Sequence, residues 1–462
     1  MATMIVSPKS QRANAASSRL NNQPDLIAPN DVIEVLEKHL LIDGFKLVFD
    51  PVKSRGSKFV DAATGKELID LYGFYASQPI GFNHPHFNNK QVEAELLAAA
   101  KIKVANSDVC TVQLAQFVQT FARVMGLAPL ERYFFIEGGG PAVENALKAA
   151  MDWKVRKNIE KGLGEYGTEI IHFEHAFHGR TGYTLSLTNT DPRKTALFAK
   201  FPWPRIVSPA IDFSLPPERR ISAVIKKERL AVQQIKEALR KKSNLIAAII
   251  IEPIQGEGGD NHFRGEFLKE LRGICDENEL LLIFDEVQSG MGLTGRKWCC
   301  EHFDVIPDLL VFGKKAQVCG VMAGPRLDEV KDNVFRLPSR ISSTWGGNFT
   351  DAVRSTHFLE IIESEKLVQN ATLKGEIFLR ELSQLAEHHE ILSAVRGRGL
   401  MLAFDLPNTG LRDVFWKGAF ELGLLVVRCG ERSIRLRPVL DLTDEVIKDA
   451  IRIMDQLCNR IH

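Results

Sequence analysis

Five short apolar runs recur through the middle of the chain, and stretches with helical periodicity separate them. The runs cover residues 132–137, 169–174, 246–253, 280–288 and 308–314. Near-continuous apolar strands that alternate with helices are typical of a mostly parallel sheet covered by helices on both faces. The pattern therefore predicts an α/β fold, in which ligands bind beyond the carboxyl ends of the strands.

Both ends of the chain show a different pattern. Residues 45–73 alternate apolar and polar positions around turn residues, which favours a small antiparallel meander. After about Gly346 come long amphipathic helices, three strand-like segments and a final helix. We expect the two ends to join in a smaller α+β domain. The predicted division is an N-terminal part of the small domain at 29–80, a large domain at 81–345 and a C-terminal small domain at 346–462.

Composition narrows the class of ligand. The 462 residues include 59 basic and 58 acidic side chains, a formal charge of +1. This balance gives no reason to expect a nucleic acid or a membrane surface as partner, so a small molecule is the expected ligand. Seven cysteines form no CxxC pair and are odd in number, which favours a reducing compartment such as the cytoplasm. No apolar stretch approaches the ~20 residues that span a bilayer.

The start of the chain is polar and basic. Its first 22 residues carry Lys9, Arg12 and Arg19 and no acidic residue. This composition resembles a transit peptide but equally a disordered tail. We interpret residues 1–28 as a flexible tail.

A glycine-rich turn follows the first of the five runs. Gly138, Gly139 and Gly140 precede Pro141, a residue suited to the first turn of a helix. The exposed N–H groups and the dipole at a helix start favour an anion, and glycines let the backbone approach it. A phosphate could therefore sit at Gly139 and Gly140. Alone the turn is weak evidence, because many such turns serve only packing.

Polar residues close the last three runs, namely Glu252, Asp285, Gln288 and Lys314. A buried aspartate needs a cation or strong donors, so a protonated heteroaromatic nitrogen would satisfy Asp285. The alternative is an aspartate that caps the next turn. A partly desolvated lysine at the next strand end would have a lowered pKa and could attack an aldehyde. Taken alone, the Lys314–Lys315 pair is more typical of a solvated loop.

These three features are jointly stronger than any one of them. A phosphate cradle, an anionic partner for a ring nitrogen and a reactive lysine are what pyridoxal 5'-phosphate requires. The sequence therefore predicts a pyridoxal 5'-phosphate site with Lys314 and Asp285 as catalytic residues.

Longer motifs carry a family resemblance. The stretches IIEPIQGEGG and LLIFDEVQSGMGLTG, the aspartate of IPDLLVFGK and the glycine-rich turn closely resemble the class III (omega) aminotransferases, which are fold-type I pyridoxal-phosphate enzymes. The match runs from about residue 30 to the end. AFHGRTGYTLSLTN, EGGGPAVENALKAA, FGKKAQVCGVMAG and SSTWGGN look most like the lysine-specific branch of this family.

The resemblance implies a role for individual residues. It favours Lys314 over Lys315 as the lysine that bonds to the cofactor. It also implies that Phe177 stacks on the cofactor ring, Asp285 pairs with the ring nitrogen, Gln288 bonds the ring hydroxyl, and Gly139 and Gly140 hold the phosphate. Thr344 resembles the residue that reaches the phosphate of the neighbouring subunit, which implies a homodimer with shared active sites.

The resemblance also implies a reaction. The ε-amino group of L-lysine would pass to 2-oxoglutarate and give 2-aminoadipate 6-semialdehyde and L-glutamate. Arg180 would take the distal carboxylate of the substrate. Arg435 would take the carboxylate beside the reacting carbon of glutamate, and Glu257 would pair with Arg435 when lysine is bound. Guanidinium groups suit both tasks because they bind carboxylates in bidentate fashion.

Some positions depart from the lysine-specific pattern. Gly140, Pro141 and Ser342 replace residues typical of that branch, and the segment around Gln78 and Pro79 also differs. These departures leave open another omega-aminotransferase that acts on ornithine, 4-aminobutyrate or a diamine. A fold that binds the cofactor without catalysis is a further alternative.

Overall fold

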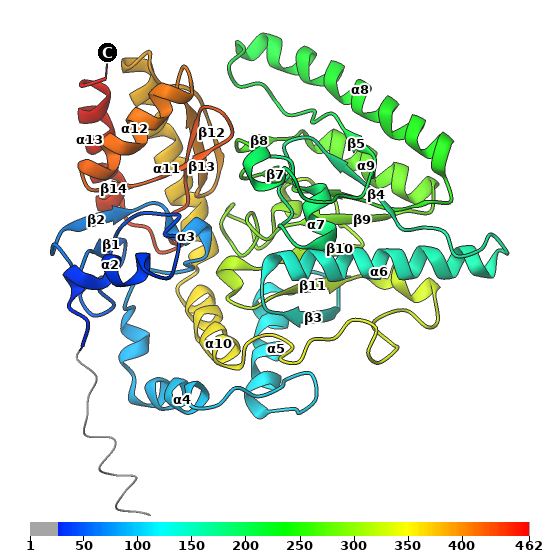
Figure 1. The fold of residues 1–462 in the computed structure, drawn as a ribbon. Helices are drawn as coiled ribbons and strands as arrows, with labels where there is room; N and C mark the ends of the chain where they lie inside the picture. The colour runs from blue at the N-terminus through cyan, green and yellow to red at the C-terminus, as the bar shows by residue number, and fades with distance from the viewer. Residues whose placement is uncertain (1–25, 462) are drawn as a thin grey trace, which may run out of the picture.

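The large sheet of the molecule has seven strands. The structure is a computed structural model that describes residues 26–461. The strands follow the order β3-β11-β10-β9-β6-β4-β5 (Figure 1), and all are parallel except β11, which is antiparallel to both neighbours. Their bounds are β3 Arg132–Ile136, β4 Glu169–Phe173, β5 Arg205–Ile206, β6 Ile246–Ile251, β9 Leu281–Asp285, β10 Leu309–Phe312 and β11 Cys319–Ala323. The predicted mostly parallel sheet is confirmed.

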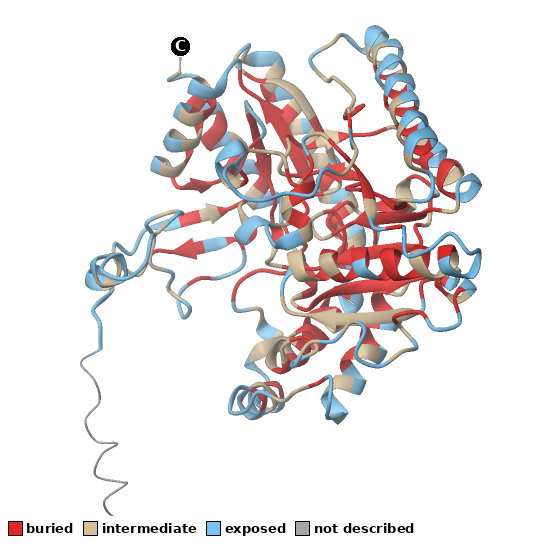
Figure 2. Ribbon diagram, turned by 45° about the vertical axis from the view of Figure 1, so that its right-hand side comes forward, coloured by how far each residue is buried: buried red, intermediate tan, exposed pale blue. Residues whose placement is uncertain are grey.

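Helices bury both faces of this sheet. On one face Ile283 and Val311 belong to a cluster with the apolar side of α6 (Gly139–Glu160). On the other face Phe284 and Phe312 pack in a second cluster that includes residues of α5 (Val112–Met125) and α9 (Gly265–Glu277). Figure 2 shows most strands of this sheet buried along their length, whereas β3 at the edge is intermediate. Burial on both sides explains why the strands are apolar at nearly every position.

Two strands of this sheet escaped the sequence prediction, the two-residue β5 and the longer β11. β11 follows β10 after the short turn η5 (Lys314–Ala316), and Gly320 interrupts its apolar residues. Glycine is depleted in strands, so the sequence pattern did not predict a strand at β11. A Cβ at Gly320 would lie 2.2 Å from the carbonyl oxygen of Phe134, so the close strand contact requires glycine here.

The two ends of the chain meet in a smaller α+β region. β2 (Glu67–Asp70) pairs with β1 (Lys58–Val60) and, in parallel, with β14 (Leu424–Leu425), which confirms the expected joining of the ends. Beside it lies an antiparallel sheet. Its strands are β12 (Ser393–Arg398), β13 (Met401–Asp405), β15 (Val427–Cys429) and β16 (Ser433–Leu436), and the region also holds α11 (Leu367–His388), α12 (Thr409–Glu421) and α13 (Asp444–Cys458).

The link between the two regions is helical. α10 (Phe349–Ser364) packs against α5 and against α4 (Lys90–Ala100), both of which precede the large sheet in the chain. The boundaries predicted at residues 80 and 345 stay predictions. All but the last three residues of the predicted tail at 1–28 lie outside the described residues. Across 26–461, the structure contains no helix long and apolar enough to span a bilayer.

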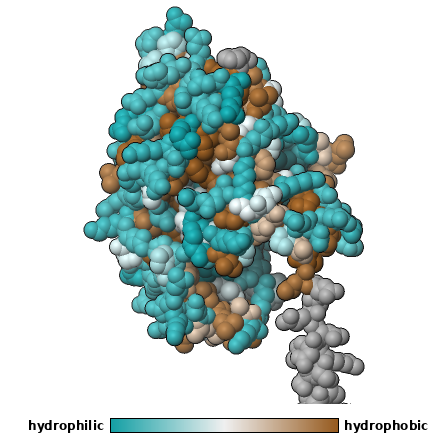
Figure 3. Space-filling model, turned by 90° about the vertical axis from the view of Figure 1, so that its left-hand side faces the viewer, coloured by the Kyte–Doolittle hydropathy of each residue, from teal (hydrophilic) through white to brown (hydrophobic). Residues whose placement is uncertain are grey.

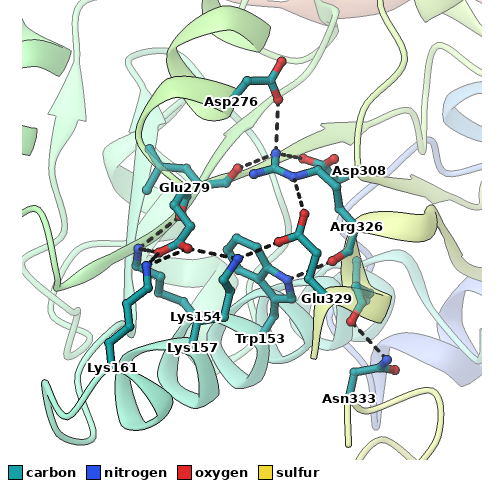
Figure 4. Close-up of polar contacts among 12 residues, drawn as sticks. Trp153, Lys154, Lys157, Lys161, Asp276, Glu279, Asp308, Arg326, Glu329 and Asn333 are labelled. Carbon is teal, nitrogen blue, oxygen red and sulfur yellow. Dashed lines mark hydrogen bonds and ion pairs between the residues drawn. The ribbon is translucent and has the colours of Figure 1, made fainter. Parts of the chain in front are cut away.

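A polar network fixes the amino end of β10. Asp308, the aspartate of the IPDLLVFGK motif, accepts a hydrogen bond from the Leu282 N–H at 2.7 Å and pairs with Arg272 at 2.9 Å and Arg326 at 3.2 Å. Figure 4 shows the Arg326 side chain bridging toward Asp308, Asp276 and Glu329. This motif residue therefore ties β9 to β10 at the end opposite Lys314.

The same network (Figure 4) contains one carboxylate held by three lysines. Glu279 lies 3.3, 2.9 and 2.7 Å from the ammonium groups of Lys154, Lys157 and Lys161; the first two lie on α6 and the third directly follows it. Partial burial raises the pKa of Glu279, but the hydrogen bonds from the lysines outweigh it and lower the pKa to about 2. The lysine side chain of Lys154 is only 4% exposed, so it depends on this partner.

We therefore expect Glu279→Gln to lower the free energy of unfolding by about 2 kcal/mol at neutral pH, a magnitude typical of hydrogen bonds to charged groups. The pKa of Glu279 in the folded state is below its ordinary value of 4.5. The difference in unfolding free energy between wild type and variant should therefore have its full size above pH 4.5 and become smaller as the pH falls toward about 2. Urea unfolding across this range measures it. Glu277→Gln, an exposed neighbour, is the control and should change little. An equal loss in both variants would contradict the assignment.

Candidate active site

Three neighbouring strands, β6, β9 and β10, end at one edge of the large sheet. Asp285 of β9 is in register with Val311 of β10, and Ile251 of β6 is in register with Phe284. Because these strands are parallel, the residues that follow them emerge at the same edge. Glu252, Asp285 and Lys314 therefore gather there.

Asp285 is buried and has an imidazole partner. His178 Nδ1 lies 2.7 Å from Asp285 Oδ2, and the Val287 N–H donates to Oδ1 at 3.1 Å. His178 is itself buried, and its Nε2 has no hydrogen-bond partner among residues 26–461. The sequence prediction missed His178, although it lies next to Phe177 in the AFHGR motif. The pair holds a carboxylate at the strand end in a fixed orientation.

Glu252 positions the backbone of Phe177. Its carboxylate accepts hydrogen bonds from the Phe177 N–H at 2.9 Å and the Gly256 N–H at 3.1 Å. Burial, against the opposing field of His178, raises the pKa of Glu252 to about 7. The loop that carries Phe177 is thereby fixed to the end of β6.

Lys314 has the properties of a nucleophile. The surrounding protein removes water from its ammonium, and Arg435 and Arg437 add positive charge, which together lower the pKa of Lys314 to about 7. Its Nζ donates a hydrogen bond to the Tyr75 carbonyl at 2.7 Å. Near neutral pH a large fraction of Lys314 is therefore the free amine that attacks carbonyl carbon.

Lys315 is oriented differently from Lys314. It is buried, and its Nζ donates to the carbonyls of Gln78 at 2.6 Å and Pro438 at 3.3 Å. Burial lowers the pKa of Lys315 to about 7 as well. Its donors are occupied by backbone, which is typical of a structural role.

The carbonyl that receives Lys314 belongs to a left-handed turn. Gly73, Phe74, Tyr75 and Ala76 all have φ between 49° and 71°. For residues other than glycine this conformation costs roughly 1–2 kcal/mol each, and such strain clusters at functional sites. A Cβ at Gly73 would lie 2.4 Å from the Arg437 carbonyl oxygen, so only glycine fits there. No pattern in the sequence indicated this turn.

The glycine-rich turn lies directly at the start of α6. Gly138 has φ 95°, and the 22-residue helix begins at Gly139. A Cβ at Gly139 would lie 3.1 Å from Val287 Cγ1, so the cradle is too narrow for a larger side chain. The N–H groups of the first turn lack intrahelical acceptors, which suits a phosphate.

Two arginines enter the site from β16 and the residues after it. Arg435 donates to Gln288 Oε1 at 3.2 Å, and Arg437 Nε donates to the same oxygen at 3.0 Å. Arg435 Nε has no partner among residues 26–461, whereas Arg437 forms a fully buried ion pair with Asp260. Arg435 is therefore the one with a free donor.

The predicted pair between Glu257 and Arg435 is not formed within the described chain. Glu257 instead pairs with Lys194 and accepts a hydrogen bond from Thr190 at 3.3 Å. Lys194 is the last residue of the short helix η3 (Pro192–Lys194), and it takes the place of Arg435 as the partner of Glu257. Its Nζ also lies 5.6 Å from the Phe177 ring centre. The sequence prediction missed Lys194 because nothing in its surroundings distinguishes it from a surface lysine.

Arg180 and Thr344 are exposed. Arg180 makes no ion pair within residues 26–461, but it adds to the positive field at Lys194. Thr344 lies before α10, and its carbonyl accepts a hydrogen bond from the Ser107 hydroxyl at 3.0 Å. The structure thus leaves both side chains free for a ligand or a partner.

The residues at this edge fit pyridoxal 5'-phosphate. The glycine cradle at α6 suits its phosphate, the buried Asp285 suits its ring nitrogen, and Lys314 suits its aldehyde carbon. The sequence profile described as aminotransferase class-III matches residues 43–458.

The chain belongs to the class-III aminotransferase family.

Relatives of this aminotransferase support the assignment. The L-lysine-epsilon aminotransferase of Mycobacterium tuberculosis is 48% identical over 92% of this chain and 94% of that protein. The enzyme of the same name from Streptomyces clavuligerus is 47% identical over 92% and 93%. The structure of the M. tuberculosis lysine aminotransferase in the internal aldimine form covers 94% of this chain and 100% of that chain, with a TM-score of 0.92 and 46% identity. This aminotransferase uses pyridoxal 5'-phosphate, as the site geometry indicates.

Substitution of the two adjacent lysines should separate their roles. We expect Lys314→Ala to lower turnover roughly 10²–10⁴-fold, because it removes the proton-transfer group, and to abolish covalent attachment of the cofactor. Lys315→Ala should keep the attachment but cost about 1–3 kcal/mol of stability, because two buried carbonyls lose their donor. Borohydride reduction followed by peptide mass spectrometry locates the attached lysine. Attachment at Lys315 would reverse the assignment.

Proposed function

We propose that this aminotransferase transfers the ε-amino group of L-lysine to 2-oxoglutarate and forms 2-aminoadipate 6-semialdehyde and L-glutamate. The observation that carries the proposal is the identity of 45–48%, over 92% of this chain, with relatives named L-lysine-epsilon aminotransferase. The arginines at the strand edge support it, since both glutamate and lysine present a carboxylate.

Each residue at the edge has a distinct task. Bound pyridoxal 5'-phosphate supplies the electron sink and carries the amino group between the two substrates. Lys314 takes a proton from the substrate carbon and returns one during each half-reaction. Asp285, oriented by His178, keeps a proton on the ring nitrogen. Gly139 and Gly140 bind the phosphate.

Three further residues hold the cofactor ring and the substrate. Phe177, fixed by Glu252, packs against the ring. Gln288 bonds the ring hydroxyl and connects it to the arginines, because its Oε1 already accepts from Arg435 and Arg437. Arg180 binds the distal carboxylate of the substrate, which for lysine is the α-carboxylate.

The same site must accept two substrates: glutamate, whose reacting carbon bears a carboxylate, and lysine, whose reacting carbon does not. Glutamate brings a carboxylate to Arg435, whereas lysine leaves this arginine unpaired. We infer that Glu257, which pairs with Lys194 in the structure, turns to Arg435 when lysine is bound. An unpaired guanidinium beside an ammonium substrate is costly in a partly desolvated site, so the switch favours lysine.

The proposed enzyme is a homodimer with shared active sites, in which Thr344 reaches the cofactor phosphate of the neighbouring subunit. Two observations support it. Thr344 is exposed at the molecular surface. The apolar side chains of Leu26 and Leu41 are 90% and 92% exposed, and hydrophobic surface gathers where the described chain begins (Figure 3). Such surface is typical of an interface.

Another omega-amine donor remains the second candidate. Ornithine is shorter than lysine by one methylene, which is worth only about 1–3 kcal/mol in a pocket. Gln78 favours this possibility because it departs from the lysine-specific pattern, and its side chain turns back to the Ile80 carbonyl at 2.7 Å. The Gln78 backbone carbonyl accepts a hydrogen bond from Lys315, the residue after Lys314, so Gln78 contacts the turn that carries Lys314.

A half-reaction tests the donor directly. We expect L-lysine to remove the absorbance band of the bound cofactor at concentrations at least roughly tenfold lower than L-ornithine or 4-aminobutyrate, since one methylene alone gives about that discrimination. 2-Oxoglutarate should restore the band. Stopped-flow absorbance measures both steps. A preference for ornithine would keep the family and replace the donor, and absence of any change would favour a binding protein without catalysis.

Glu257→Gln tests the proposed switch. We expect it to slow the lysine half-reaction by about tenfold or more and to leave the glutamate half-reaction within roughly threefold, because only lysine needs the arginine neutralised. The same variant thus contains its own control. Equal effects on both half-reactions would show that Glu257 serves only to hold Lys194.

A further inference from the structure

Two imidazoles and a carboxylate converge away from the candidate active site. His86 belongs to the short helix η2 (Pro85–Asn88), and His357 and Glu360 belong to α10. His86 Nε2 lies 3.1 Å from His357 Nδ1, and His357 Nδ1 lies 3.7 Å from a Glu360 carboxylate oxygen. Their donor atoms all lie within 4.8 Å of one another.

Local structure fixes this arrangement. His357 and Glu360 are three residues apart on one helix, so their side chains share a face. His86 is placed by the capping of η2, because the ring of His84 accepts a hydrogen bond from the His86 N–H at 3.3 Å. The cluster therefore joins two elements far apart in sequence.

We propose that His86, His357 and Glu360 bind a divalent first-row metal ion such as Zn²⁺, with water in the fourth position. Zinc binds imidazole nitrogen at about 2.0–2.1 Å, so two tetrahedral donors lie about 3.3 Å apart. The two facing nitrogens have nearly this spacing. A hydrogen bond between the imidazoles would account for that contact alone and would not explain why Glu360 faces the same point.

A second carboxylate completes the pattern of a metal site. His357 Nε2, the nitrogen turned away from the cluster, lies 3.3 Å from Glu95 Oε2 of α4. Histidines that bind a metal usually donate their other N–H to a carboxylate, which fixes the ring and its tautomer. Glu95 is held in turn by Gln91, which donates to its other oxygen at 3.1 Å.

The site is open to an ion from solvent. His357 is only 9% exposed, whereas Glu360 and Glu95 are 38% and 40% exposed. An ion can therefore enter along the carboxylates and replace their water. Histidine with carboxylate favours zinc and its neighbours over magnesium or calcium, which prefer oxygen donors alone.

The position of the cluster suggests a structural effect. Ser355, two residues before His357, donates to the Ala316 carbonyl at 2.8 Å, in the turn that begins with Lys314. η2 follows the segment whose Tyr75 and Gln78 carbonyls receive Lys314 and Lys315. A bound ion would link α10 to η2, the two elements next to the turn that begins with Lys314. It would also raise the stability of the folded enzyme, because it binds the folded state and not the unfolded one.

Calorimetric titration of the chelator-treated holoenzyme with Zn²⁺ tests the proposal. We expect one equivalent per chain and a rise in the thermal unfolding midpoint. His86→Asn and Glu360→Gln should each weaken the affinity at least tenfold, and Glu95→Gln should weaken it by roughly 10–100-fold, as lost partners of ligating histidines do. Cofactor absorbance and circular dichroism verify that each variant is folded.

His389→Ala is the matched control, because His389 also contacts a carboxylate, Asp455 at 2.7 Å, but has no second imidazole beside it. It should keep the affinity of the wild type. The proposal is overturned if no binding is found, or if Glu360→Gln and His86→Asn bind Zn²⁺ as tightly as His389→Ala does. If Glu360→Gln were the only folded variant to lose Zn²⁺ binding, the histidines would not be ligands and the proposal would be wrong.

Discussion

The parallel pairing of β9 with β10, buried on both faces, is the constraint on which the site depends. It brings Asp285 and the turn at Lys314 to one edge, and the neighbouring β6 adds Glu252. Because the sheet excludes water up to its last residues, groups at the edge are desolvated, and burial moves the pKa values of Glu252 and Lys314 to about 7 from opposite directions. The fold thus leaves the Lys314 amine partly neutral near neutral pH, while the buried Glu252 holds the backbone of Phe177.

Arg437 connects this edge to the smaller region. It is fully buried, pairs with Asp260, donates to Gln288, and its N–H donates to the Leu71 carbonyl at 2.7 Å. The strained turn that begins at Gly73 leaves no room for a side chain against the Arg437 carbonyl. The same residue therefore stabilises the wall of the site and contributes the positive field that keeps Lys314 partly neutral.

The sequence predicted the site where a polar residue directly follows an apolar strand along the chain. The apolar runs predicted five strands, and polar residues at their ends predicted the edge with Asp285 and Lys314. It failed where a partner is distant in sequence: His178 lies 107 residues from Asp285, and Lys194 lies 63 residues from Glu257. The left-handed turn at Tyr75 depends on contacts with η5 and Arg437, which no local pattern contains.

The contact between Glu257 and Lys194 changes how the charges of the site can be understood. Burial lowers the pKa of Lys194, and the fields of Arg435 and Arg180 lower it further, although Asp191 opposes them. A carboxylate that entered between the two arginines would cancel part of this field and strengthen the charge on Lys194. Lys194 can then hold Glu257 aside while a dicarboxylate is bound. When lysine brings no second carboxylate, the positive field on Lys194 stays, and we expect Glu257 to be released more easily toward Arg435. The identity of the substrate would itself set the position of Glu257.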